Sequence, residues 1–201
     1  HRVFGAVVFP ASAFFEMAMG VAREVFGQRE VALTNVTIGR ALTLTEAPVT
    51  VQMVATPNGD RFDFEISSRV EEDGETRWVQ HTTGVLERRL PSPAASINIE
   101  ETLAAYTKPV DLDELTARFE ARGLEYFLRF RAIEEIHLGE GADTRMAFAR
   151  IKLPAEANLA GDRYRLHPVL TDASFRIAEA KYHDEDLENV HLPIGISGFS
   201  C

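Results

Sequence analysis

The chain has little cysteine, few basic residues and no long apolar run. A single cysteine among 201 residues, Cys201, excludes internal disulfide bonds and is typical of a reducing compartment, so we expect a cytoplasmic protein. The 21 Lys and Arg are outnumbered by 31 Asp and Glu, which gives a formal net charge of −10. This balance argues against a nucleic-acid-binding protein and against docking on an anionic membrane surface. No segment has the pattern of a membrane-spanning helix or a signal peptide.

Common catalytic and metal-binding motifs are also absent. The sequence has no H-E-x-x-H, G-x-x-x-x-G-K-[ST], G-x-S-x-G or C-x-x-C pattern. His183 and His191 fit no metal-ligand spacing of the zinc type, so we expect no metal site. His81 is predicted to be a strand residue packed beside Trp78, not a catalyst.

The opening stretch is the first informative feature that is present. It reads H-x-x-x-G-x-x-x-x-P, from His1 through Gly5 to Pro10. Residues 14–26 follow and are mostly Phe, Met, Ala and Val, which predicts a buried helix too short to span a bilayer. Ser12 is the expected N-cap of that helix. A histidine therefore lies one short strand away from the start of a buried helix.

The remaining pattern predicts helices and antiparallel strands in two halves. Gly27 is the expected C-cap of the first helix, and Asn58-Gly59-Asp60 is a hairpin signal. Apolar residues at helical spacing predict an amphipathic helix over 111–122, and a second buried helix is expected after Pro168. Alternation of polar and apolar residues predicts strands, at 31–38, 41–44, 49–55, 61–67, 78–86, 132–138 and 145–153. The periodicity alone predicts an α+β fold.

A second informative stretch runs Leu166-His167-Pro168-Val169-Leu170-Thr171-Asp172. Together with the opening motif, with Trp78–Gly84 and with Leu192-Pro193-Ile194-Gly195, it occurs in the order found in one family. The chain resembles the dehydratase domains of modular polyketide synthases, and the resemblance covers nearly all of residues 1–201. Four matches in order are a specific signal, although each motif alone is weak.

The resemblance implies a double hot dog, in which two antiparallel sheets each wrap a central helix. We expect an N-terminal half at 1–90, a linker at 91–110, where Pro91 and Pro93 flank Ser92, and a C-terminal half at 111–201. Family domains extend further on both sides, so each half is expected to be truncated and the chain to belong to a longer polypeptide.

The implied activity is dehydration of a 3-hydroxyacyl thioester to a 2-enoyl thioester. By resemblance, His1 is the base that removes a C2 proton and Asp172 the acid that protonates the departing hydroxyl. The same resemblance implies substrate-binding roles for a further set of residues, namely Gly5, Pro10, Tyr126, Arg176 and Pro193. The backbone N–H of Gly5 is the group expected to polarise the thioester carbonyl.

Alternatives remain for each of these residues. The alternative for His1 is a frayed terminus or a tag remnant, although the spacing to Gly5 and Pro10 favours the motif. Gly5 is equally read as a bulge or turn glycine. Asp172 fits the N-cap of the second helix, while His167 is expected to make a structural hydrogen bond.

The resemblance also implies partners. The substrate is expected on the phosphopantetheine arm of an acyl carrier protein, with no metal or redox cofactor in the domain itself. Neighbouring synthase domains and a homodimer are expected. A basic group is the candidate surface for an acidic carrier, or else a solvated face; it comprises Arg118, Arg122, Arg129 and Arg131.

Two departures from the family pattern bear on the reaction. Arg176 stands four residues after Asp172, where the family usually has Gln or His, and an i,i+4 pair would favour the carboxylate anion unless Arg176 points to solvent. The family's Y-G-P-x-F motif reads Tyr126-Phe-Leu-Arg-Phe130 here. These changes raise two alternatives: an enoyl isomerase that shifts a double bond, and a catalytically silent structural domain.

Overall fold

The computed structural model describes residues 1–27, 30–89, 96, 98–104, 106–139, 147–157, 163–180 and 191–200. The chain forms two compact units. Unit 1 contains residues 1–5, 93–163 and 167–191, and unit 2 contains residues 6–92, 164–166 and 192–201. The predicted boundary at 91–110 stays a prediction, and residues 90–95, 97 and 105 lie outside the described part. Each end of the chain belongs to the unit formed mainly by the other half of the sequence.

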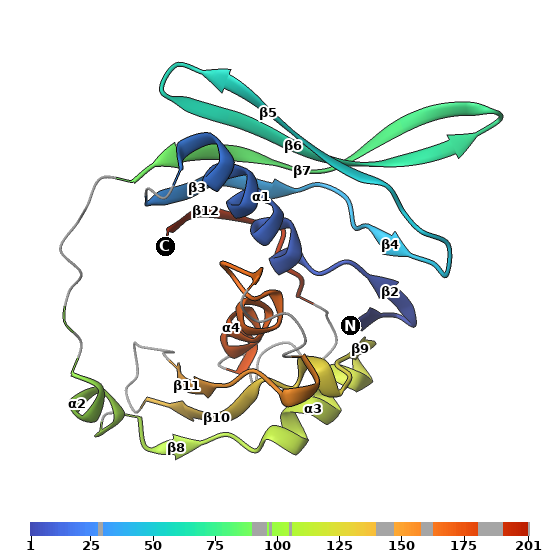
Figure 1. The fold of residues 1–201 in the computed structure, drawn as a ribbon. Coiled ribbons are helices and arrows are strands. Elements are labelled where there is room, and N and C mark those ends of the chain that lie inside the picture. Colours follow the sequence, from blue (N-terminus) through green and yellow to red (C-terminus); the bar gives the residue numbers. More distant parts are fainter. Residues whose placement is uncertain are drawn as a thin grey trace. The chain divides into compact units, whose positions relative to one another are not determined.

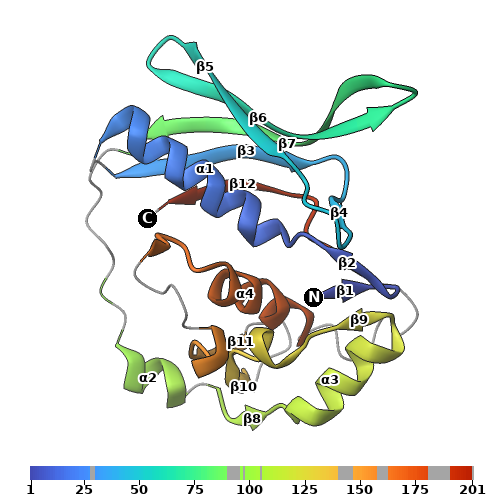
Figure 2. The same cartoon turned by 45° about the vertical axis from the view of Figure 1, so that its right-hand side comes forward.

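Unit 2 is built on one helix and a five-stranded antiparallel sheet with the strand order β12-β3-β7-β6-β5 (Figure 1). Helix α1 (Ala11–Phe26) packs on one face of this sheet, against β3, β5 and β7. The strands of the unit are β2 (Ala6–Val8), β3 (Val31–Ile38), β4 (Thr43–Leu44), β5 (Val51–Asn58), β6 (Arg61–Glu72), β7 (Glu75–Arg88) and β12 (Gly195–Ser200). Figure 2 shows α1 running along the sheet.

The predicted first helix is confirmed, but its predicted N-cap is wrong. Pro10 is the N-cap, with φ −70° and ψ 147°, and Ser12 is fully buried inside the first turn. The proline already has its φ fixed near the required value, and its carbonyl accepts the N–H of Ala13 at 3.0 Å. Gly27 is the C-cap as predicted, because its φ of 73° is open to glycine and its N–H reaches the Arg23 carbonyl.

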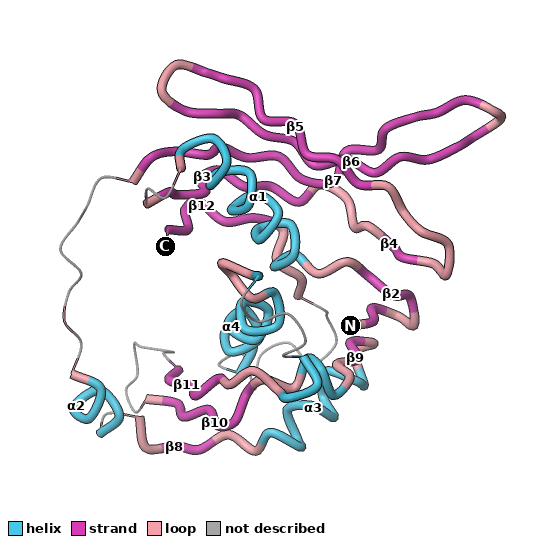
Figure 3. Tube along the Cα trace, in the orientation of Figure 1, coloured by secondary structure: helices cyan, strands magenta, loops and turns pink. Residues whose placement is uncertain are grey.

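The long strands are joined by tight hairpins, as the sequence predicts (Figure 3). Asn58 pairs with Arg61, so Gly59 and Asp60 form a two-residue turn. The apolar side chains of the long strands pack with those of α1 in one core. It includes Phe14, Phe15, Met19, Leu33, Val36, Phe64, Ile66 and Leu86. These pairings fix which face of each strand is buried.

His81 is a structural residue of this core, as predicted, but its predicted neighbour is wrong. The ring of His81 stacks on Phe14 with 6.1 Å between centroids, while the Trp78 side chain is 44% exposed. The imidazole Nε2 lies 2.8 Å from Ser68 Oγ, and Nδ1 lies 3.1 Å from the carbonyl oxygen of Arg40. Both ring nitrogens of this buried histidine therefore have partners.

Unit 1 has a second central helix, α4 (Pro168–Ala180), packed on a three-stranded sheet with the order β11-β10-β8 (Figure 1). Its other elements are β1 (Arg2–Val3), α2 (Ile99–Ala104), β8 (Lys108–Pro109), α3 (Leu112–Ala121), β9 (Leu124–Glu125), the 3-10 helix η1 (Leu128–Phe130), β10 (Ile133–Leu138) and β11 (Ala147–Ile151). The predicted helix over 111–122 and strand over 132–138 are confirmed. Residues 145–146 of the predicted strand and His183 lie outside the described residues.

Helix α3 and the β9 segment form the core of unit 1. Asp111 caps α3, since its side chain accepts the N–H groups of Asp113 and Glu114 at 2.9 and 3.0 Å. The buried residues of this core are Leu115, Phe119, Leu124, Tyr126, Ile136 and Ala180. Tyr126 thus lies where α3, β10 and α4 meet, which brings it next to the residues of the candidate site.

Candidate active site

The second helix begins at Pro168, and His167 caps it. Nδ1 of His167 accepts the N–H of Val169 at 3.3 Å, and its carbonyl accepts the N–H of Leu170 at 3.0 Å. Proline is favoured at the first helical position, where the missing N–H is not needed. The structural hydrogen bond predicted for His167 is confirmed. The alternative that Asp172 is the N-cap is wrong, because Asp172 is the fifth residue of α4.

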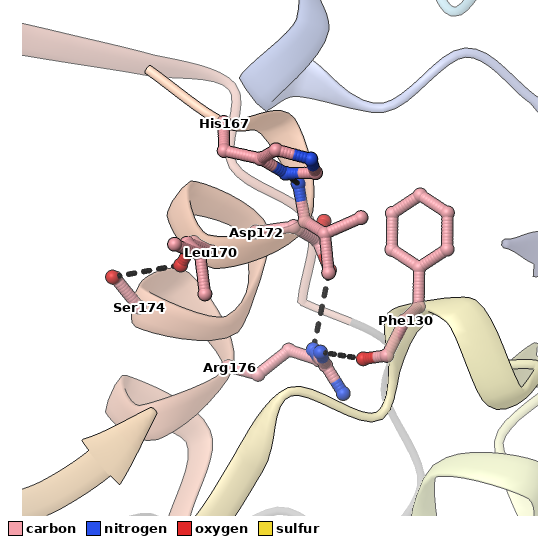
Figure 4. Close-up of polar contacts among 7 residues, drawn as sticks. Phe130, His167, Leu170, Asp172, Ser174 and Arg176 are labelled. Carbon is pink, nitrogen blue, oxygen red and sulfur yellow. Dashed lines mark hydrogen bonds and ion pairs between the residues drawn. The ribbon is translucent and has the colours of Figure 1, made fainter. Parts of the chain in front are cut away.

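Asp172 and Arg176 form a buried ion pair on one face of α4 (Figure 4). Nε of Arg176 lies 3.2 Å from Oδ2 of Asp172, and the two residues are only 8% and 7% exposed. The predicted i,i+4 pairing is confirmed, and the alternative of a solvent-facing Arg176 is wrong. The pair joins two residues one helical turn apart and is largely shielded from solvent.

The guanidinium of Arg176 has two further contacts beyond Asp172. Nη2 donates a hydrogen bond to the carbonyl oxygen of Phe130, at the end of η1. The guanidinium carbon lies 4.2 Å from the centre of the Tyr126 ring, within the range of a cation–π contact. One side chain therefore joins the carboxyl of Asp172 to the segment that carries Tyr126 and Phe130.

Burial raises the pKa of Asp172 from 3.8 to about 6, because the low-dielectric surroundings disfavour the anion. Arg176 lowers this pKa, but its effect is smaller than that of burial. The elements packed on α4 carry further charged groups. Glu135 on β10 lies 3.6 Å from His137 and 2.9 Å from Arg150, and Glu134 lies 3.6 Å from Lys152, which follows β11. Arg129 lies on η1. Arg176 favours the anion as expected, yet the carboxyl still titrates near neutrality.

His1 packs against the rings of Tyr126 and Phe130. Strand β1 pairs with β9 in antiparallel register, Arg2 with Glu125 and Val3 with Leu124, so the first residue comes beside Tyr126. The imidazole lies 5.3 Å from the Tyr126 ring and 6.0 Å from the Phe130 ring, measured between centroids. The side chain is half-buried. His1 is therefore a packed residue of unit 1, and the alternative of a frayed terminus is wrong.

Four of the predicted site residues thus come together in unit 1: His1, Tyr126, Asp172 and Arg176. Gly5 forms the turn between β1 and β2 with a φ of 77°, is exposed, and its carbonyl accepts from Arg2 Nη1 at 2.6 Å. The turn role of Gly5 is confirmed, whereas the role of its N–H toward a thioester stays a prediction. Pro10 and the exposed Pro193 belong to unit 2, and their substrate-binding roles also stay predictions.

Two contacts were not predicted. The carbonyl of Phe130, which anchors Arg176, is a backbone group and carries no sequence signal. The carboxylate of Glu16 on α1 accepts the N–H groups of Arg165 and Leu166 at 3.0 and 2.6 Å. The sequence signal that could have indicated such a partner is Glu16 itself, an acidic residue in the first two turns of a largely apolar helix. This contact holds the segment just before His167.

Across the described ranges there is no group of three or more His, Cys, Asp or Glu side chains able to hold a metal ion. The same residues contain no helix long and apolar enough to cross a membrane.

Comparison with known families decides the identity of the chain. Residues 1–69 match the family model described as the polyketide synthase dehydratase domain, and residues 94–201 match the one described as the polyketide synthase dehydratase N-terminal domain. The chain belongs to the polyketide synthase dehydratase family. The pikromycin polyketide synthase component PikAII of Streptomyces venezuelae is 32% identical over 185 residues, which cover 90% of this chain but 5% of that protein.

Other relatives give the same result. The spectinabilin polyketide synthase protein NorB of Streptomyces orinoci is 32% identical over 213 residues, which cover 100% of the chain and 9% of NorB. The dehydratase structure from the CurF module of curacin polyketide synthase matches with a TM-score of 0.89 and 27% identity, over 99% of this chain and 71% of that one. The CurK dehydratase matches with a TM-score of 0.86 and 29% identity, over 98% and 68% of the two chains.

These similarities confirm two predictions: the family and the α+β double hot dog fold. The chain spans only 5% and 9% of the length of these two curated relatives, and 71% and 68% of the two dehydratase structures.

Proposed function

We propose that His1 is the general base and Asp172 the general acid of this dehydratase. The observation that carries the proposal is a buried carboxyl with a pKa of about 6 in the same unit as a packed imidazole. A group that titrates near neutrality is suited to proton transfer at physiological pH. Asp172 and the packed imidazole of His1 both belong to unit 1, where Tyr126 contacts His1 and Arg176 contacts Asp172.

In the proposed reaction, a neutral nitrogen of the His1 imidazole takes the proton from C2 of the 3-hydroxyacyl thioester. The electron pair of that C–H bond forms the C2–C3 double bond while the C3–O bond breaks. The protonated carboxyl of Asp172 gives its proton to the departing hydroxyl, which leaves as water. His1 then carries the extra proton and Asp172 the negative charge, so one proton transfer from imidazolium to carboxylate restores the site.

The resting charge state of Asp172 supports this assignment. With a pKa of about 6, the carboxyl is partly protonated near neutrality despite its ion pair with Arg176. A substrate that displaces water from the site adds to the desolvation of the carboxyl and raises its pKa further. Two structures of CurK dehydratase inactive mutants support the same pair of residue types. In one a histidine is replaced by phenylalanine, and in the other an aspartate is replaced by asparagine.

The substrate is proposed to arrive on the phosphopantetheine arm of an acyl carrier protein, with other synthase domains as neighbours and a homodimer as the assembled form. Elimination of water changes no oxidation state overall, so the proposal includes no metal or redox cofactor in the domain.

The cytoplasm is the proposed location, because one cysteine in 201 residues is typical of a reducing compartment.

The buried ion pair favours one second candidate function. A carboxylate held as the anion by Arg176 is a poor proton donor, and an isomerase that moves a proton between C2 and C4 needs chiefly His1. A silent structural domain remains the third candidate.

The test is a mass-spectrometric assay of the full-length protein with a carrier-bound 3-hydroxyacyl thioester and the matching 2-enoyl thioester. Loss of 18 mass units of water, on the order of 10²-fold slower or more in His1→Ala and Asp172→Asn, is the expected result. Deuterium uptake at C4 of the enoyl chain without water loss would identify an isomerase. A protein inert toward both thioesters would be a structural domain.

A further inference from the structure

Arg176 does more than pair with Asp172. Its guanidinium contacts the Asp172 carboxyl and the Phe130 carbonyl (Figure 4). It also lies over the face of the Tyr126 ring. Arginine remains charged even when buried, and its planar fork fixes the direction of each contact. Arg176 is only 8% exposed, and its guanidinium has three partners, so it has little freedom to move.

Tyr126 and Phe130, which contact the guanidinium of Arg176, are also the two residues whose rings contact His1. Tyr126 and Phe130 lie 5.3 and 6.0 Å from the imidazole, between ring centroids. The proposed base therefore rests on one side of this aromatic pair, and the proposed acid is tied to the same pair through Arg176. His1 directly precedes β1, and Asp172 lies on α4.

We propose that Arg176 is a positioning residue that fixes Asp172 relative to His1 by tying the carboxyl to the Tyr126–Phe130 segment. This inference rests on the proposed function. It assigns to the arginine a role that depends on its fork and not on its charge alone.

Two substitutions separate the fork from the charge. Arg176→Lys keeps a positive charge beside Asp172, but a single ammonium does not contact Asp172, the Phe130 carbonyl and the Tyr126 face together. Arg176→Gln removes the charge and keeps one amide group able to reach a single partner. A positioning role predicts that both variants lose turnover at their best pH, whereas a role of charge alone predicts that Arg176→Lys behaves as the wild type.

The pH dependence distinguishes the two variants. Arg176 lowers the pKa of Asp172, so its removal in Arg176→Gln shifts the alkaline limb of kcat/KM upward, by about 1 to 3 units. In Arg176→Lys the limb stays where it is in the wild type while kcat falls about tenfold or more, as expected for a displaced acid. The KM for the carrier-bound substrate changes little in either variant.

A matched control exists on the surface of the same unit. Nε of Arg150 lies 2.9 Å from Oε1 of Glu135, and these side chains are 64% and 39% exposed. Arg150→Lys makes the same chemical change in an arginine–carboxylate pair outside the site. It is expected to leave kcat and the pH limb unchanged.

The experiment combines turnover of the full-length protein between pH 5 and 9 with a carbon-13 titration of the Asp172 carboxyl in each variant. Wild-type turnover in Arg176→Lys would overturn the positioning role, as would full turnover of Arg176→Gln at its own optimum. A wild type that fails to dehydrate overturns the proposed function alone; the inference is then judged by crystal structures of the variants. The inference fails if Asp172 keeps its place relative to Tyr126 in the variants that lack the Arg176 guanidinium. Where a variant is too unstable to assay, Tyr126→Leu replaces it, because this substitution removes the ring beneath Arg176. The inference also fails if Tyr126→Leu retains wild-type geometry and turnover.

Discussion

The imidazole of His1 meets the ring of Tyr126 edge-on, with 5.3 Å between the centroids and 65° between the planes. This geometry is typical of favourable aromatic pairs. It gives the first residue of the chain a fixed place in unit 1, beside the segment that also contacts Arg176. The functional role proposed for His1 and its structural role can therefore be tested separately.

His1→Phe is predicted to keep the packing and lose the reaction. Phenylalanine retains a ring against Tyr126 and Phe130 but has no nitrogen to accept a proton. We expect water elimination to slow on the order of 10²- to 10⁴-fold. The free energy of unfolding, measured by urea titration, should change by less than about 0.5 kcal/mol. His1→Ala loses the ring pair as well and should be less stable by about 0.5–1.5 kcal/mol. Wild-type turnover in His1→Phe would show that another group is the base.

Asp172 predicts a pH dependence of stability. Its pKa is about 6 in the folded chain and 3.8 in the reference state, so between these values the folded chain binds more protons than the unfolded chain. Stability from this group is fully present below about pH 4 and is lost as the pH rises through about 6. A rise of about 2 units corresponds to about 3 kcal/mol at most.

Asp172→Asn tests this dependence, because asparagine has nearly the same shape and no charge to titrate. We expect the stability of the wild type relative to Asp172→Asn to fall by up to about 3 kcal/mol between pH 4 and pH 7.5, as measured by urea unfolding. The sign is opposite to that of an ordinary salt-bridged carboxylate. A relative stability that rises over this interval would mean that Arg176 outweighs burial and that Asp172 is held as the anion.

The local parts of this fold were predictable and the long-range parts were not. The strand at 31–38 and the helix capped by Asp111 follow from periodicity and capping within a few residues. The Arg176–Asp172 pair follows from one turn of helix. In contrast, the approach of His1 to Tyr126 depends on pairing between β1 and β9, over 120 residues apart in the chain. No local pattern encodes that pairing or the backbone acceptor at Phe130.

The cap of α3 gives a prediction for stability alone. The Asp111 carboxylate accepts two backbone N–H groups that have no other partner in the helix. Asp111→Ala should lower the free energy of unfolding by about 1 kcal/mol, within a range of 0.5–2 kcal/mol. Asp113→Ala makes the same change of charge in the first turn without removing a cap, so its cost should be smaller. Equal effects of the two substitutions would indicate that charge near the helix end, and not the cap, stabilises α3.

Gly84 gives the sharpest packing prediction. In β7 it pairs with Phe64 of β6, and a Cβ atom at this glycine would lie 2.7 Å from Cε1 of that ring and 3.0 Å from Cγ2 of Val36. Both neighbours are buried, at 4% and 2% exposure, so neither has room to withdraw. Gly84→Ala should therefore destabilise unit 2 by about 1–3 kcal/mol through overpacking.

Gly198 in β12 of the same sheet is the matched control, since a Cβ there would meet nothing within 4 Å. Gly198→Ala should be neutral or stabilise by up to about 1 kcal/mol, because alanine restricts the unfolded chain. Phe64→Leu should be less costly in the Gly84→Ala background than in the wild type, because a smaller side chain relieves the clash. Additive effects of the two substitutions would show that the ring of Phe64 does not fill the space that Gly84 leaves open.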